Sequence, residues 1–217
     1  PCYMSQVYRL GEKEFREERM VGYSISADEL WEELRKDQVF FEESAGGITF
    51  SGGEPLLQSV FLLEMLKRCR AAHFRTCVDT AGAVQVKELE EICRYTDLFL
   101  YDVKTADPGK FKEFIGEGYE KVWENLDRIV RYGTSVLIRI PVIPGVNDTE
   151  ADLSAIVSRL STMPALHRIE LLPFHRTGAD KYRRLGRKYG MGETAGLTEN
   201  GISGIKEYFR KNGYEVL

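Results

Sequence analysis

Short apolar runs alternate with longer amphipathic segments along most of this chain. The runs are rich in β-branched and aromatic residues, a composition typical of buried strands. They cover residues 48–50, 75–78, 98–104, 136–143, 169–173 and 214–216. The segments between them repeat apolar residues at helical spacing, which predicts helices over about 57–71, 87–94, 119–132, 149–160 and 198–211, with a short helix from Pro108. In the helix over 57–71 the predicted apolar side consists of Val60, Leu63, Met65 and Leu66.

The first part of the chain follows a different pattern. Residues 1–22 are polar, carry a charge cluster and show no clear period, so we expect an irregular segment there. Ser26 followed by Glu29 has the spacing of a capping box and predicts a helix through about Lys36.

Alternation of strand and helix favours a parallel sheet connected by right-handed crossovers. No GxGxxG motif follows a strand, so a dinucleotide-binding sheet is not supported. We therefore expect an α/β fold: a barrel or partial barrel of β/α units that occupies residues 23–217 as one domain.

Composition narrows the function classes. The 217 residues carry 30 basic and 34 acidic side chains, with a net charge of −4 and no basic block, which argues against a nucleic-acid partner. The apolar runs are too short to cross a membrane and no segment resembles a secretory signal, so we expect a cytoplasmic protein. The cysteines, Cys2, Cys69, Cys77 and Cys93, lack metal-ligand spacing and are interpreted as reduced or buried thiols.

The segment Gly46–Gln58 combines a strand with an unusual exit loop. Gly52 and Gly53 carry no Cβ, so backbone could approach a ligand closely there. Glu54 adds a negative charge suited to an ammonium group. The alternative is an ordinary strand-to-helix turn.

Polar residues follow or interrupt the other strands as well. They are Asp79 and Thr80, then Asp102 and Lys104, then Arg139, then His175. Ligands of β/α folds bind at the carboxyl ends of the strands, and charges buried there need partners or a ligand. The set suits a zwitterionic, amino-acid-like small molecule.

Each of these residues also has a structural interpretation. Asp79-Thr80 could cap a helix, Asp102 and Lys104 could form an ion pair, Arg139 could be an internal counter-ion, and His175 could be an ordinary loop histidine. Their recurrence at successive strand ends favours a shared site.

Five segments occur in a fixed order: GGITFSGGEPLLQ, TCVDTAG, DLFLYDVK, LIRIPVIPGVND and LLPFHRTGADKYRRLG. From about Tyr23 to its end the chain thereby resembles the radical S-adenosylmethionine superfamily, specifically the activating enzymes of glycyl radical enzymes such as pyruvate formate-lyase. The resemblance implies a partial TIM-type (β/α)6 barrel that holds S-adenosyl-L-methionine and a 4Fe–4S cluster. It also implies reductive formation of a 5′-deoxyadenosyl radical, hydrogen abstraction from a glycine of the partner enzyme, and an electron donor such as flavodoxin or ferredoxin.

The resemblance also assigns residues. It implies that Gly52, Gly53 and Glu54 lie near the methionyl amino group and that Asp102, Val103 and Lys104 lie beside the cofactor. Asp79, Thr80 and Asp102 match a monovalent-cation site next to the cofactor carboxylate, and Arg139 and His175 match residues that line the pocket. A zwitterionic methionyl group needs these opposite charges in a shielded site.

One departure is large: the family's CxxxCxxC motif and the first strand that precedes it are missing from the sequence. A cluster needs closely spaced thiolates, which the scattered cysteines do not supply. We therefore expect the C-terminal part of an activating enzyme, inactive alone, in which Cys2 could be the remnant of a ferredoxin-like insert. The alternatives are a cluster-less relative that binds S-adenosylmethionine or a protein partner, and a β/α-barrel lyase that uses Lys104 as a Schiff-base amine.

Overall fold

A parallel sheet forms the centre of the molecule. The computed structural model describes residues 2–10, 13–174, 197 and 199–217. Six strands lie in chain order, each hydrogen-bonded in parallel to the next. They are β3 (Gly47–Phe50), β4 (Arg75–Thr80), β5 (Leu98–Asp102), β6 (Ser135–Val142), β7 (Arg168–Pro173) and β8 (Glu215–Val216). All six predicted strands are therefore present, and the α/β prediction is confirmed.

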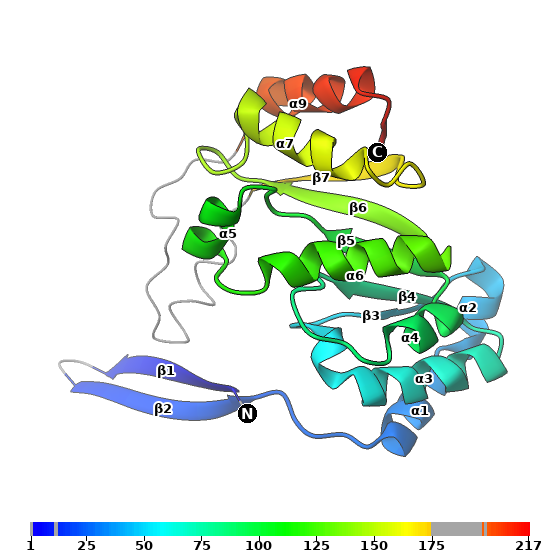
Figure 1. Ribbon diagram of the computed structural model, residues 1–217. Helices are drawn as coiled ribbons and strands as arrows, with labels where there is room; N and C mark the ends of the chain where they lie inside the picture. The colour runs from blue at the N-terminus through cyan, green and yellow to red at the C-terminus, as the bar shows by residue number, and fades with distance from the viewer. Residues whose placement is uncertain (1, 11–12, 175–196, 198) are drawn as a thin grey trace.

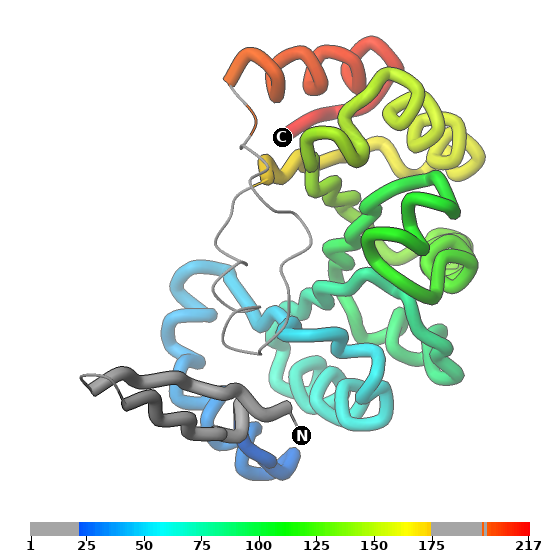
Figure 2. The backbone as a smooth tube through the Cα atoms, turned by 90° about the vertical axis from the view of Figure 1, so that its left-hand side faces the viewer, coloured from blue at the N-terminus to red at the C-terminus, as the bar shows by residue number. Residues whose placement is uncertain are grey.

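Helices connect consecutive strands, because a parallel pair needs a crossover to bring the chain back. Figures 1 and 2 show the elements following one another in an open arc, from blue to red. The helices are α1 (Ala27–Arg35), α2 (Gln38–Ser44), the short 3₁₀ helix η1 (Pro55–Gln58), α3 (Ser59–Ala71), α4 (Leu89–Tyr95), α5 (Pro108–Phe114), α6 (Tyr119–Tyr132), α7 (Glu150–Leu160) and α9 (Glu199–Lys211). The sequence pattern did not predict α2 or separate η1 from α3. None of the described helices is long and apolar enough to span a bilayer.

One face of the sheet is covered by these helices. Side chains alternate between the two faces of a strand, and Phe99 and Tyr101 of β5 are fully buried in the main core. The same core includes Leu66 of α3, Leu126 of α6 and other apolar residues from α4, α7 and α9. The residues between the buried ones therefore project from the opposite face, where the polar side chains gather.

A smaller apolar cluster closes the β3 end of the sheet. Phe74 packs edge-on against Phe41 of α2 and at a tilt against Trp31 of α1. The predicted capping box is confirmed, because the Ser26 hydroxyl accepts the Glu29 N–H and Glu29 accepts the Ser26 N–H.

The prediction of an irregular segment over residues 1–22 is wrong. β1 (Cys2–Leu10) and β2 (Lys13–Val21) form an antiparallel pair with Cys2 opposite Val21 and Leu10 opposite Lys13. Antiparallel pairing satisfies backbone hydrogen bonds whatever the side-chain pattern, so a mostly polar strand and a charge-rich one, neither with a clear apolar period, escaped recognition.

Candidate functional site

A row of polar side chains crosses the face of the sheet opposite the helices. Asp79 on β4, Asp102 on β5, Arg139 on β6 and Glu170 on β7 are all half-buried and alternate with fully buried neighbours. Asp102 is the Cα partner of Arg139, which in turn is the partner of Glu170. Parallel strands in this register bring four residues that are far apart in sequence to one surface.

Arg139 connects two carboxylates of this row. Its Nε donates to Oδ1 of Asp102 at 3.0 Å, and its Nη2 donates to Oδ1 of Asp79. Lys104 pairs with the other oxygen of Asp102, with 3.2 Å between Nζ and Oδ2. The Arg139 side chain is 17% exposed and those of Asp79 and Asp102 are 21% and 20% exposed, so water screens these pairs only in part.

Glu54 lies where the exits of β3 and β4 meet. It is the N-cap of η1, and its Oε1 accepts the N–H of Leu56 at 3.1 Å and the hydroxyl of Thr80 at 2.5 Å. Its Oε2 accepts the N–H of Ala81 at 3.1 Å. Three donors therefore hold one half-buried carboxylate in a fixed orientation.

The two glycines before Glu54 have positive φ angles, +84° for Gly52 and +73° for Gly53. That conformation favours glycine over any residue with a Cβ. A Cβ added at either position would meet no described atom within 4 Å. Glycine is thus required by the turn itself, and the backbone borders free space into which a ligand can approach.

The side chains predicted to hold a monovalent cation have other partners. Asp79 and Asp102 are paired with Arg139, and the Thr80 hydroxyl is bonded to Glu54. Within the described ranges no three His, Cys, Asp or Glu side chains come close enough to hold a metal ion.

The other predicted residues differ in position. Val103 is fully buried and its side chain belongs to the main core, while its N–H bonds to the carbonyl of Arg139 at 2.9 Å. His175 lies outside the described residues. Glu54, Asp79, Thr80, Asp102 and Lys104 lie at or beside the carboxyl ends of β3 to β5, and Arg139 lies within β6, as predicted.

Sequence reasoning missed two residues that shape this site. Asn147 is buried, and its amide donates to the carbonyls of Lys104 at 2.6 Å and Pro141 at 2.7 Å, which joins the exits of β5 and β6. Glu170 extends the polar row to β7. A polar residue between Ile169 and Leu171 was the available signal for Glu170, whereas nothing local marks the long-range role of Asn147.

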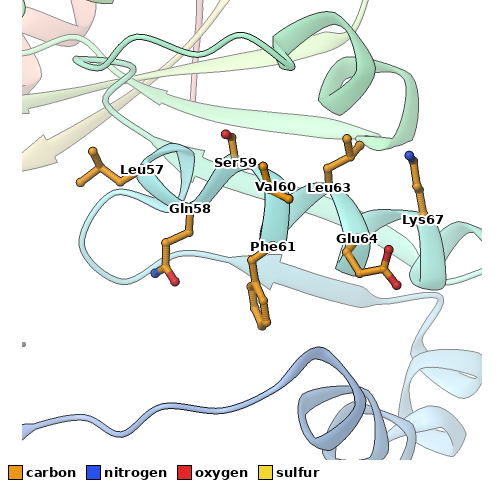
Figure 3. Close-up of a pocket in the computed structure, with 8 residues that line it drawn as sticks. All are labelled: Leu57, Gln58, Ser59, Val60, Phe61, Leu63, Glu64 and Lys67. Atoms are coloured by element: carbon orange, nitrogen blue, oxygen red, sulfur yellow. The ribbon is translucent and has the colours of Figure 1, made fainter.

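A separate pocket of about 670 Å³ lies on η1 and α3 (Figure 3). Leu57 and Val60, which help to line it, are each 71% exposed. The prediction that Val60 belongs to the buried side of this helix is therefore wrong. None of the charged residues of the polar row lines this pocket.

Comparison with known proteins identifies the family. The Radical SAM superfamily model matches residues 2–155. The (2S)-3-sulfopropanediol dehydratase activating enzyme of Klebsiella oxytoca is 34% identical over 202 residues, which cover 90% of this chain and 63% of that protein. The pyruvate formate-lyase-activating enzyme of Clostridium pasteurianum is 31% identical over 190 residues, which cover 88% and 79% respectively. The chain therefore belongs to the radical SAM superfamily, among the activating enzymes of glycyl radical enzymes.

Solved structures agree on the fold. A domain of a pyruvate-formate lyase-activating enzyme from Bacteroides vulgatus superposes with a TM-score of 0.66 at 28% identity, covering 79% of this chain and 98% of that one. Streptococcus suis SuiB bound to S-adenosylmethionine superposes with a TM-score of 0.65 at 15% identity, covering 91% of this chain and 44% of that one. At this identity the likeness shows a shared fold only. The predicted partial barrel is confirmed. The chain spans between 56% and 66% of the length of six of its curated relatives.

The family implies S-adenosylmethionine and a 4Fe–4S cluster, and the described thiols do not fit the cluster. Cys69 and Cys93 are buried in α3 and α4, and burial raises the pKa of each to about 11. Cys77 lies on β4, where burial also raises its pKa. A cluster needs three neighbouring thiolates, which Cys69, Cys77 and Cys93 do not supply.

Proposed function

We propose that this chain forms the S-adenosylmethionine-binding part of an enzyme that generates a glycyl radical on a partner enzyme. The observation that carries the proposal is the fixed Glu54 carboxylate beside the Asp79–Arg139–Asp102–Lys104 network. The cofactor supplies the radical chemistry when bound, and this chain supplies its position and electrostatic environment.

The charges of the site support a zwitterionic, cationic ligand. Glu54 accepts the methionyl ammonium, while Lys104, which is half-buried, offers an ammonium to the methionyl carboxylate. Four described carboxylates (Glu54, Asp79, Asp102 and Glu170) face two cations (Lys104 and Arg139), so this set carries two negative charges, four minus two. S-adenosylmethionine has a net positive charge because of its sulfonium, which matches this excess.

Gly52, Gly53 and Val103 contribute backbone in this proposal. The exit loop of β3 borders free space at its glycines, and Val103 leaves only its main chain for the cofactor because its side chain belongs to the core. Arg139 orders the two aspartates, and His175 remains a proposed pocket residue on the family resemblance alone. A monovalent cation at Asp79, Thr80 and Asp102 also remains a prediction, and it would share these carboxylates with Arg139.

The partner and the electron donor belong to the same proposal. The relatives are activating enzymes of different partners, among them pyruvate formate-lyase and (2S)-3-sulfopropanediol dehydratase. We propose a glycyl radical enzyme of this group as the substrate and a flavodoxin or ferredoxin as the electron donor, in the cytoplasm.

The test is reductive cleavage of S-adenosylmethionine by the whole protein, reconstituted anaerobically with iron and sulfide and supplied with dithionite. We expect 5′-deoxyadenosine from the wild type and at least tenfold less from Glu54→Gln, because the amide removes the charge that faces the ammonium. The matched control is Glu43→Gln, which makes the same change at an exposed position of α2. A cluster-loaded wild type that leaves the cofactor intact would refute the proposal.

The cluster-less and Schiff-base alternatives have their own tests. The coding sequence upstream of Pro1 decides whether a CxxxCxxC motif belongs to the whole protein. Lys104 is ion-paired with Asp102, whereas a Schiff-base lysine reacts as a neutral amine. Borohydride with carbonyl substrates should leave Lys104 unlabelled.

A further inference from the structure

The hydroxyl of Thr80 forms the middle of a buried hydrogen-bond chain that ends at Glu54. Thr80 is 2% exposed. Its hydroxyl accepts the N–H of Gly82 at 2.9 Å and donates to Oε1 of Glu54 at 2.5 Å. With its single proton committed to the carboxylate, the hydroxyl has one defined orientation.

The loop that carries Thr80 is itself fixed by α6. Asn125 is 1% exposed, and its Nδ2 donates to the carbonyls of Gly82 and Val84, both at 2.8 Å. A buried amide with two main-chain acceptors keeps the β4 exit loop in one conformation. The chain of hydrogen bonds therefore runs from α6 through Gly82 and Thr80 to Glu54.

Packing around Gly82 limits the same loop from the other side. The Tyr101 hydroxyl donates to the carbonyl of Val122 at 2.6 Å, and a Cβ at Gly82 would lie 1.8 Å from that hydroxyl oxygen. Gly82 also has φ of +64°. Only glycine allows the loop to lie this close to Tyr101, and this closeness sets the position of the Gly82 N–H that holds Thr80.

We propose that Thr80 is a positioning residue whose hydroxyl orients the Glu54 carboxylate toward the ammonium group of an amino-acid-like ligand. This inference rests on the proposed function, because it takes Glu54 as the acceptor of the methionyl ammonium. Glu54 has rotatable bonds that η1 alone restrains through one N–H, so the Thr80 hydroxyl and the Ala81 N–H select its rotamer before a ligand binds. Preorganisation of this kind increases affinity without adding a contact to the ligand.

Two ligands separate positioning from general support of the fold. S-adenosylmethionine carries the methionyl ammonium and a sulfonium, whereas 5′-deoxy-5′-methylthioadenosine has the same nucleoside with a neutral thioether and no amino-acid end. The whole protein, purified anaerobically, is titrated with each ligand by calorimetry. Thr80→Val should raise the Kd for S-adenosylmethionine about tenfold, the range expected for a hydrogen bond to a charged group, and change that for methylthioadenosine less than twofold.

Conservative and matched variants complete the test. Thr80→Ser keeps the hydroxyl and should restore the affinity for S-adenosylmethionine to within twofold. Thr96→Val removes another buried threonine hydroxyl, which donates to the carbonyl of Ile92 at the end of α4. This variant should change the Kd of neither ligand. Thr80→Ala removes the hydroxyl without a new methyl contact and replaces Thr80→Val if circular dichroism shows that valine prevents folding.

The outcomes distinguish this inference from the proposed function. If Glu54→Gln leaves the affinity for S-adenosylmethionine unchanged, the proposed function is wrong at this residue. If Glu54→Gln weakens binding but Thr80→Val and Thr80→Ala do not, Thr80 has no positioning role. Equal weakening of both ligands by Thr80→Val would also overturn the inference, because it indicates a purely structural role.

Discussion

Arg139 donates its Nε–H to Oδ1 of Asp102 at 3.0 Å across the β5–β6 pair, and the same guanidinium reaches Asp79 on β4. One side chain thus joins three neighbouring strands at the surface where we propose that the ligand binds. The contact is an ion pair, and it holds two of the aspartates of the proposed site in fixed positions.

Replacing Arg139 should destabilise the protein. In Arg139→Met two partly buried carboxylates lose their shared counter-ion, and we expect a loss of about 2 kcal/mol in the free energy of unfolding, less than for a fully buried pair. Urea denaturation measures it. Arg131→Met is the control, because the Arg131 side chain, which pairs with Asp127, is 79% exposed. This substitution should lower the free energy of unfolding by less than about 0.5 kcal/mol. Equal effects of the two variants would show that the Arg139 network adds no stability.

Alanine substitutions at Gly82 and Gly133 distinguish the cost of backbone strain from the cost of steric conflict. Both have positive φ, +64° and +91°, but a Cβ at Gly133 would meet nothing within 4 Å. Gly133→Ala should therefore cost about 1 kcal/mol of conformational strain. Gly82→Ala should cost clearly more, at least about 2 kcal/mol, because Tyr101 must move. Thermal unfolding compares them, and similar melting temperatures would argue against the tight Gly82–Tyr101 packing.

These long-range contacts mark the limit of what the sequence could predict. The capping box at Ser26 depends on residues three apart, so it was predicted and is present. Strand ends were also predictable, because apolar runs stop there. The pairing of Arg139 with both Asp79 and Asp102 depends on strand register and rotamer, which no local pattern encodes.

Thr80 illustrates the same limit. The pair Asp79-Thr80 was interpreted either as a helix cap or as part of a cation site. In the structure the Thr80 hydroxyl bonds to Glu54, 26 residues earlier in the sequence, a partner that neither interpretation named. For Lys104 and Asp102 the sequence did name the contact that forms, because the ion pair given as their structural interpretation is present.

Stability should fall in acid because of Asp152. Burial alone would raise the pKa of this carboxyl, but hydrogen bonds from Lys110 and Thr149 outweigh it, and the net pKa is lowered. A lowered folded-state pKa adds stability that is present above the ordinary value of about 3.9 and is lost as the pH falls through the folded-state pKa. As the pH falls below about 4, the free energy of unfolding should decrease more steeply for the wild type than for Asp152→Asn. Parallel curves would contradict this role.

Thiol labelling tests where the ligand lies. At pH 8 iodoacetamide should modify Cys77 slowly, because Cys77 is half-buried on the polar face and burial raises its pKa. Cys69 and Cys93 should stay unmodified until unfolding, because both are buried with a pKa of about 11. Saturating S-adenosylmethionine should slow labelling of Cys77 at least about tenfold, since Cys77 precedes Asp79 by two residues on the same face. Mass spectrometry of peptides resolves each site. Unchanged labelling of Cys77 would place the ligand elsewhere.

The most direct test of the account is a structure of the whole protein with S-adenosylmethionine bound. We predict that the methionyl nitrogen lies within hydrogen-bonding distance of a Glu54 oxygen, about 3 Å, while the Thr80 hydroxyl still donates to that carboxylate. A cofactor bound away from the exits of β3 and β4, or one whose ammonium contacts another group while Glu54 faces its carboxylate, would contradict the site proposed for this chain.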